Sequence, residues 1–193
     1  MVRFKGVNHL ALATNDMNKT MRYWRELLGF RLVDSMGQPG YRHYFFALTE
    51  NDTVAFFEWD GVQPLPHKDH GAPVKGPFGF DHVAFGVETE DDLWEMKDKL
   101  QAAGFHVSDV VDHGIIHSIY THDPNGIPIE FCCDTPDIDI RNSPIMMDKT
   151  PVQNAQEGSE PLLEKWPRPL KRTPSAERNI YPGVGSEVYP FLK

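Results

Sequence analysis

Val7-Asn8-His9-Leu10-Ala11-Leu12 has a counterpart 73 residues further along the chain, Phe80-Asp81-His82-Val83-Ala84-Phe85. A second pair, Val54-Ala55-Phe56-Phe57-Glu58-Trp59 and Ile127-Pro128-Ile129-Glu130-Phe131, is separated by 72 residues. Offsets this similar indicate an internal repeat, in which each copy begins with a histidine stretch and ends with a glutamate stretch. Because the repeat is long and has two copies, it predicts a pseudo-twofold pair of modules instead of a solenoid.

The first copy has the residue pattern of one strand, one helix and three further strands. Asp16 closes a Thr-Asn-Asp segment whose side-chain oxygens can accept a hydrogen bond from a free backbone N–H at a helix start. Gly29 can adopt the left-handed conformation that ends a helix, and apolar residues recur between the two at helical spacing. We therefore expect a helix there, and strands at residues 4–13, 30–36, 41–48 and 53–60.

The second copy repeats this order. Thr89, with Asp92 three residues later, resembles a capping box, and Gly104 corresponds to Gly29 at an offset of 75. We expect a helix between Thr89 and Gly104. The strands are expected at residues 80–87, 105–112, 116–122 and 127–133. Each copy is therefore predicted to be a βαβββ module, which gives an α+β fold.

The repeat divides the chain into four segments. Residues 1–60 form the first module, 61–79 a linker rich in proline and glycine, and 80–133 the second module. Residues 134–193 form an extended arm with nine of the sixteen prolines. We expect this arm to pack on the paired modules or on a partner subunit, because it is too rich in large apolar side chains for a solvated tail. These side chains are Trp166, Tyr181, Tyr189, Phe191 and Leu192.

The composition is that of a globular protein, with 40% hydrophobic and 24% charged residues over 193 positions. The net charge of −9 disfavours a nucleic-acid partner, because no basic patch is available to neutralise phosphates. No apolar stretch approaches the ~20 residues of a membrane span, and residues 1–5 lack a signal-peptide pattern. Cys132 and Cys133 are adjacent and cannot form an ordinary disulfide with each other. We expect a cytoplasmic protein.

Four side chains in the repeated stretches are typical metal ligands. Because side chains alternate along a strand, His9 and His82 are expected at equivalent places, and so are Glu58 and Glu130. Apolar residues flank both glutamates, and a carboxylate among them is costly to bury unless a cation or a donor compensates it. Two imidazoles with one or two carboxylates suit Fe(II), Mn(II), Ni(II), Zn(II) or Co(II). The alternatives are hydrogen-bonded core histidines and a Glu58 that pairs with a surface lysine.

Residues 4–133 resemble the vicinal oxygen chelate superfamily, which includes glyoxalase I, extradiol dioxygenases and fosfomycin-resistance proteins. The resemblance is carried by residues 8–12, 23–30, 80–85 and 118–131, the last of which reads Ser-Ile-Tyr-Thr-His-Asp-Pro-Asn-Gly-Ile-Pro-Ile-Glu-Phe. It implies two βαβββ modules whose strands curl into a half-open barrel around a divalent metal. It also implies a small-molecule substrate and a homodimer.

Two ligand patterns within this family fit the chain. Glyoxalase I uses all four positions, which are His9, Glu58, His82 and Glu130 here. Extradiol dioxygenases use two histidines and one glutamate, which correspond to His9, His82 and Glu130. The three-residue pattern leaves open positions on the metal for a catecholate and for O₂.

The resemblance to the dioxygenases extends upstream of the final glutamate. These enzymes place a tyrosine ten residues before it, and Tyr120 stands there. They also use a nearby upstream histidine, for which His113 and His117 are the candidates. Many of them carry a further acid–base histidine where this chain has Asp52, so that His43 or His67 would have to substitute.

These features favour an extradiol-type ring-cleaving dioxygenase that acts on a catechol-like aromatic and uses Fe(II) or Mn(II). Tyr120 and either His113 or His117 would handle protons. The alternative is a glyoxalase I-like isomerase, lyase or epimerase with Ni(II), Zn(II) or Co(II), in which Glu58 or Glu130 acts as base. A third possibility is a drug-binding protein without metal ligands. An apolar wall is expected from Phe45, Phe56, Phe57, Trp59 and Phe85.

Overall fold

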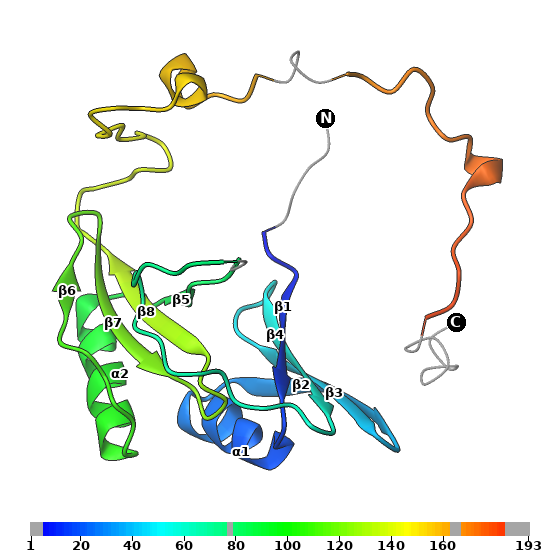
Figure 1. Cartoon of the computed structure of the whole chain (residues 1–193), viewed down its shortest axis with the longest axis vertical. Coiled ribbons are helices and arrows are strands. Elements are labelled where there is room, and N and C mark those ends of the chain that lie inside the picture. The colour runs from blue at the N-terminus through cyan, green and yellow to red at the C-terminus, as the bar shows by residue number, and fades with distance from the viewer. Residues whose placement is uncertain (1–5, 77–78, 163–166, 184–193) are drawn as a thin grey trace. The chain divides into compact units, whose positions relative to one another are not determined.

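The computed structural model describes residues 6–76, 79–162 and 167–183 (Figure 1). The chain divides into two units, Met1–Ile138 and Asp139–Lys193. The first unit contains both halves of the repeat and all of the candidate site residues. Among the described residues, no helix has both the length and the apolar character needed to cross a bilayer.

The first module is an open four-stranded sheet with helical turns between its first two strands. Its sheet has the order β1-β4-β3-β2, in which β1 and β4 are parallel and the other neighbours antiparallel. The elements are β1 (His9–Thr14), α1 (Met17–Met21), the π-helical η1 (Arg22–Leu27), β2 (Arg31–Gln38), β3 (Tyr41–Ala47) and β4 (Thr53–Trp59).

The second module has the same connectivity, with the sheet order β5-β8-β7-β6 and a parallel pair β5–β8. Its elements are β5 (Val83–Gly86), α2 (Glu90–Ala102), β6 (Val111–Asp112), β7 (Ile116–His122) and β8 (Pro128–Asp134). The predicted α+β fold of two βαβββ modules is therefore confirmed. Both sheets are open.

The expected helix signals are present. The side chain of Asp16 accepts a hydrogen bond from the backbone N–H of Lys19, and Thr89 forms a complete capping box with Asp92. Gly29 and Gly104 follow the helices at φ +84° and +85°, a region that favours glycine.

Three expected elements differ in the structure. The strand expected at 80–87 shortens to Val83–Gly86, so that His82 directly precedes it. The first strand starts at His9 instead of residue 4, and residues 1–5 lie outside the described residues. The strand expected at 105–112 shortens to Val111–Asp112. Between residues 105 and 110, side chains instead of a neighbouring strand bond to two backbone carbonyls. Lys97 donates to the Ser108 carbonyl, and Thr121 donates to the His106 carbonyl. These bonds replace part of a strand ladder.

Trp24 of η1 lies at the centre of the core and has no exposed surface. Its ring contacts Phe56 of the first module and Phe85 of the second, with centroid separations of 5.2 Å and 5.7 Å. Its Nε1 donates to Asp123 in the β7–β8 turn (3.3 Å). The two modules therefore share one core, in which Trp24 makes apolar ring contacts with both modules and one hydrogen bond to the second.

The linker contacts the β7–β8 turn. The backbone N–H of Leu65 donates to the carbonyl of Asn125 (2.8 Å), next to Gly126, which has φ +76°. A Cβ atom on Gly126 would lie 2.5 Å from the Leu65 carbonyl oxygen. Glycine is therefore required there for its backbone conformation and also for its lack of a side chain.

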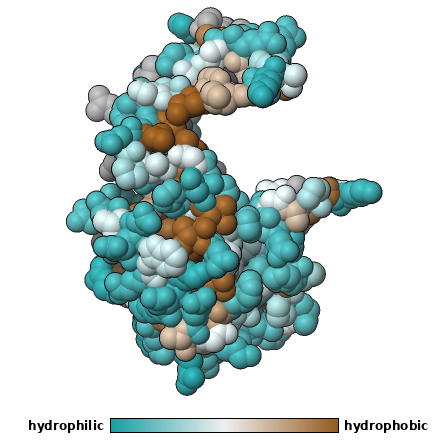
Figure 2. Space-filling view, turned by 90° about the vertical axis from the view of Figure 1, so that its left-hand side faces the viewer, coloured by the Kyte–Doolittle hydropathy of each residue, from teal (hydrophilic) through white to brown (hydrophobic). Residues whose placement is uncertain are grey.

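The second unit contains two short 3-10 turns among its described residues, η2 (Gln153–Glu157) and η4 (Ser175–Glu177). Trp166, Tyr189, Phe191 and Leu192 lie outside the described residues. Figure 2 shows hydrophobic patches set in a largely hydrophilic surface. The exposed large apolar residues of this unit are Ile145, Met146, Met147, Val152, Leu170, Ile180 and Tyr181. The packing of the arm on the modules or on a partner stays a prediction.

We predict that Gly126→Ala lowers the free energy of unfolding by about 3 kcal/mol, because it adds a backbone clash to a strained φ. The matched control is Gly104→Ala, which has a positive φ but no atom within 4 Å of the added Cβ, and should cost about 1 kcal/mol. Urea unfolding of the two variants measures the difference. Equal losses would contradict the close approach of the linker.

Candidate active site

The register of the second sheet brings His82 and Glu130 together. On β8, Glu130 pairs with Ala84 of β5 and with Tyr120 of β7. His82 precedes Ala84 by two residues and therefore lies on the same face. His82 Nε2 lies 2.7 Å from Glu130 Oε2, and Glu130 is only 3% exposed. The structure therefore places these two candidate metal ligands side by side.

Asp81 orients the imidazole of His82. Its Oδ2 lies 2.8 Å from His82 Nδ1 and also accepts from the backbone N–H of Gly71, while Lys68 pairs with the other oxygen. The hydrogen bond from Gly71, together with Lys68 and His82, holds the pKa of Asp81 well below its usual range. A tautomer that donates from Nδ1 to this carboxylate leaves Nε2 for a ligand on the Glu130 side.

Ser118 and His82 together satisfy the buried carboxylate of Glu130. The Ser118 hydroxyl, two residues before Tyr120 on β7, donates to Glu130 Oε1. One carboxylate oxygen therefore contacts a hydroxyl and the other an imidazole. This arrangement compensates the cost of burial and fixes the direction of the carboxylate.

Tyr120 is the centre of a second group of side chains beside this pair. His113 Nε2 lies 2.9 Å from its hydroxyl, and the ring of His70 stacks on the tyrosine at 3.3 Å. Burial and the neighbouring Glu130 raise the pKa of Tyr120 to about 12, so its hydroxyl stays protonated at neutral pH. Burial and the neighbouring His82 lower the pKa of His70. The structure therefore brings His113 and, from the linker, His70 to Tyr120.

His117 faces the other side of the same strand. Its ring nitrogens lie 3.6 Å from Glu90 Oε2 on α2 and 3.6 Å from Asp112 Oδ1 on β6. Strand alternation places it one residue out of phase with Ser118 and Tyr120. Of the two candidate histidines, the structure brings only His113 to Tyr120.

Glu58 does not occupy the place expected for it. In the second sheet, Ala84 stands two positions after His82 and pairs with Glu130. In the first sheet, the residue two positions after His9 is Ala11, and it pairs with Ala55. Ala55 is therefore the counterpart of Glu130. Glu58 pairs with Thr14 at the far end of β1 and lies on the opposite face from His9.

The contacts of Glu58 give it a different role. Its Oε1 accepts from the backbone N–H of Met17 at the start of α1 (2.7 Å), and its Oε2 pairs with Arg42. A carboxylate there stabilises the first turn of the helix. The expectation that Glu58 lies at the place equivalent to Glu130 is corrected accordingly, because similar spacing in the sequence did not produce the same strand phase.

His9 lies on an aromatic face of the first sheet. Its ring is 5.7 Å from Phe45, whose neighbour His43 stacks on Phe57 at 3.6 Å, and Phe57 stacks on Trp59 at 4.8 Å. Burial and the nearby His9 lower the pKa of His43. The Nε2 of His43 is buried and has no hydrogen-bond partner among the described residues. Of the expected wall, Phe56 and Phe85 lie instead in the core around Trp24.

The donor set fits a divalent cation in part. His82 Nε2 and the Glu130 carboxylate are adjacent and oriented by further hydrogen bonds, as mid-hardness metal ligands usually are. His9 belongs to the other sheet. Among the described residues, no three His, Cys, Asp or Glu side chains lie close enough to hold a metal ion together. Two of the three candidate ligands, His82 and Glu130, therefore lie next to each other.

The sequence and fold identify the class of protein. Residues 6–131 match the model of the Glyoxalase/Bleomycin resistance protein/Dioxygenase superfamily, and the chain belongs to this family. A glyoxylase/bleomycin resistance protein/dioxygenase domain from Frankia sp. EAN1pec has the same fold, with a TM-score of 0.58 over 69% of this chain and all of that one. Its sequence is 21% identical, so the likeness concerns the fold alone.

Two curated relatives carry different activities. The chain is 31% identical over 138 residues to an iron-dependent extradiol dioxygenase from Rhodococcus jostii (strain RHA1), which covers 67% of this chain and 43% of the relative. It is 24% identical over 128 residues to a lactoylglutathione lyase from Haemophilus influenzae, covering 64% of this chain and 88% of that enzyme. The chain thus spans less than half the length of the dioxygenase.

We predict that Glu58→Gln and Glu130→Gln affect different properties of the protein. The first should leave metal affinity unchanged and lower the free energy of unfolding only slightly, because the solvent-exposed ion pair with Arg42 is lost while the amide oxygen can still accept from Met17. The second should lower metal affinity by at least about tenfold. Calorimetric titration with Mn(II) and urea unfolding measure the two quantities. Loss of metal affinity in Glu58→Gln would restore the four-ligand pattern.

Proposed function

We propose that this chain is a divalent-metal dioxygenase of the extradiol type, acting on a catechol-like aromatic with Fe(II) or Mn(II). The observation that carries the proposal is the strand phase of Glu58, which points away from the face that bears His9. Without Glu58 the candidate ligands are two histidines and one carboxylate, His9, His82 and Glu130. That set suits a metal with open positions for substrate and O₂.

His82 and Glu130 would hold the metal, with His9 from the other sheet as the third ligand. Asp81 keeps Nε2 of His82 directed toward Glu130, and Ser118 fixes the carboxylate. When bound, such a metal lowers the pKa of a coordinated hydroxyl and brings a catecholate and O₂ together. The protein contributes the orientation of the ligands and the exclusion of water.

Tyr120 and His113 would handle protons beside the metal ligands. The tyrosine hydroxyl is protonated at neutral pH and can donate a hydrogen bond to a substrate oxygen. His113 contacts the same hydroxyl at 2.9 Å and can exchange a proton with it. His70 covers the tyrosine ring and keeps water from one side of it.

The aromatic face of the first sheet supports an aromatic substrate. Phe45, Phe57 and Trp59 offer ring surfaces, and the small Ala55 stands where the second sheet has Glu130. An apolar aromatic ligand gains from burial against such rings. The buried Nε2 of His43 has no hydrogen-bond partner among the described residues, so it can donate a hydrogen bond to the substrate or accept one from it.

The alternative is a lactoylglutathione lyase-like isomerase or lyase with Ni(II), Zn(II) or Co(II). The observation in its favour is the relative from Haemophilus influenzae, because the match covers 88% of that lyase. In this case Glu130, released from the metal, would be the base. The position of Glu58 counts against it, because the four-ligand set is then incomplete.

Oxygen uptake tests the proposal. We expect the Fe(II)- or Mn(II)-loaded chain, prepared without air, to consume O₂ in the presence of a catechol from a panel and to form a yellow ring-fission product. The zinc-loaded chain is the control for the metal and should consume none. Metal binding with turnover of a hemithioacetal and no O₂ uptake would support the lyase instead and refute the dioxygenase.

We predict that Tyr120→Phe lowers kcat about 100-fold while leaving metal affinity unchanged, because the variant keeps the ring and loses the proton donor. His113→Gln should have a similar effect, and the double variant should add little, since the two groups act on one proton. His117→Gln is the matched control on the opposite face of β7 and should keep full activity. Steady-state kinetics separates the variants, and loss of activity in His117→Gln would contradict the assignment.

A further inference from the structure

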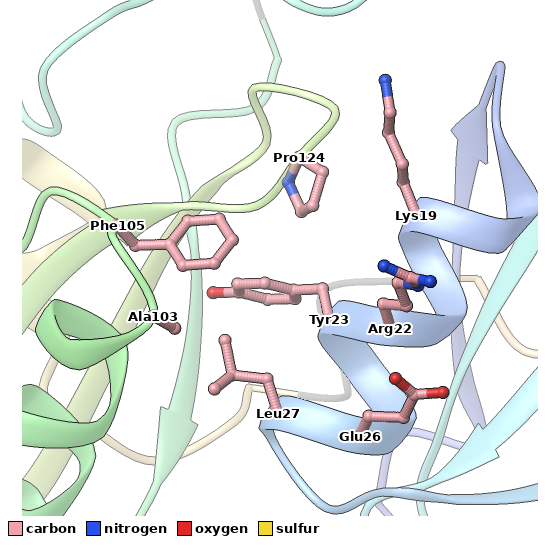
Figure 3. Close-up of a pocket in the computed structure, with 8 residues that line it drawn as sticks. All are labelled: Lys19, Arg22, Tyr23, Glu26, Leu27, Ala103, Phe105 and Pro124. Atoms are coloured by element: carbon pink, nitrogen blue, oxygen red, sulfur yellow. The ribbon is translucent and has the colours of Figure 1, made fainter.

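A cavity of about 560 Å³ lies apart from the His82–Glu130 pair and shares no residue with it. One wall is η1, and the opposite wall is the turn that follows α2 (Figure 3). The lining residues are Lys19, Arg22, Tyr23, Glu26, Leu27, Ala103, Phe105 and Pro124. A cavity of this size accommodates a small organic molecule.

The interior of the cavity is largely apolar and its helical edge is basic. Tyr23, Leu27, Phe105 and Pro124 supply ring and aliphatic surface. The basic residues Lys19 and Arg22 line the same helical side, in a chain whose net charge is −9. A cationic edge beside an apolar surface attracts an anion that carries an apolar body.

The acidic residues near this edge do not neutralise it fully. Glu26 pairs with Arg25, which does not line the cavity, and Lys19 lies 3.8 Å from Asp16. No ion pair of Arg22 is found among the described residues. Arg22 is therefore available for a planar anionic group such as a carboxylate, which guanidinium binds with two hydrogen bonds.

The hydroxyl of Tyr23 gives a second, independent indication of a ligand. Tyr23 is 2% exposed, and its hydroxyl has no hydrogen-bond partner among the described residues. Figure 3 shows the ring extending from η1 across the cavity, with the hydroxyl directed toward Phe105 and Ala103. A buried hydroxyl without an acceptor is unfavourable, and a ligand oxygen would satisfy it.

We propose that this cavity binds a small amphipathic carboxylate. Its carboxylate contacts Arg22 and Lys19, its apolar body lies over Tyr23, Leu27 and Phe105, and a carbonyl-type oxygen accepts a hydrogen bond from the Tyr23 hydroxyl. The site is separate from the proposed catalytic site and does not depend on the presence of a metal.

The test uses 4-benzoylbenzoate, which combines a carboxylate, a ketone oxygen and two aromatic rings, titrated into the full chain by calorimetry. We expect saturable binding of one molecule per chain. Arg22→Gln should weaken it about tenfold, because a charge-assisted hydrogen-bonded pair is lost. Arg31→Gln, which removes the same charge outside the cavity, should leave it unchanged.

Tyr23→Phe distinguishes a ligand contact from a structural role. The variant removes an unpaired hydroxyl, so the thermal midpoint of the free chain should stay the same or rise, while the affinity for 4-benzoylbenzoate falls about fivefold. A merely structural hydroxyl would not change the affinity. An unchanged affinity in Tyr23→Phe would therefore overturn the hydrogen bond proposed for the ligand.

Three further outcomes would overturn the proposal. They are the absence of saturable binding at millimolar ligand, unchanged affinity in Arg22→Gln, and loss of binding in His82→Ala, which would place the ligand at the catalytic site. Sedimentation of Leu27→Asp covers the remaining alternative. If this variant dissociates a dimer of the native chain, the cavity is an interface between two copies instead of a ligand site.

Discussion

The structure depends on the buried carboxylate of Asp123 in the turn between β7 and β8. It accepts hydrogen bonds from Trp24 Nε1, from the side chain and backbone of Asn125 and from the backbone of Ile127. Burial raises the pKa of this carboxyl, although each of these donors favours the charged form. Asn125 in turn accepts from Thr14 at the end of β1 (2.7 Å). One turn of the second module thus fixes both the helix and the first strand of the first module, and the relative position of the two sheets follows from it.

The repeat in the sequence was sufficient to predict the connectivity, because it preserves strand alternation and helix ends in both copies. Spacing alone was insufficient for the site. Glu58 follows His9 by 49 residues and Glu130 follows His82 by 48, yet hydrogen-bond register places them on opposite faces of their sheets. Glu130 pairs with the residue two positions after His82, whereas Glu58 pairs with the residue five positions after His9. This shift of three residues reverses the strand face, and the unequal lengths of the intervening segments could not be resolved from the sequence.

Other site residues lacked a signal in the sequence. His70 stands in the proline- and glycine-rich linker, where no periodicity assigns it to a face, and its place against Tyr120 follows from contacts of the linker with Asp81 and His122. His113 and His117 were equivalent candidates until the register of β7 separated them. The π-helical geometry of η1, which carries Trp24 and Tyr23, also had no signal in the sequence, because helical spacing alone predicts an ordinary α-helix there.

The two modules differ at the position that Glu130 occupies in the second sheet, and electrostatic repulsion favours this difference. A second carboxylate facing Glu130 would add repulsion between like charges in a site with little solvent. The first sheet instead carries Ala55 at the equivalent position, beside Phe45 on the neighbouring strand. Ala55 is fully buried there, while the second sheet carries the polar side chains of Glu130, His82 and Tyr120. The repeated fold thus provides two similar sheets, one of which carries Glu130 and Tyr120 as a cross-strand pair where the other carries Ala55 and Phe45.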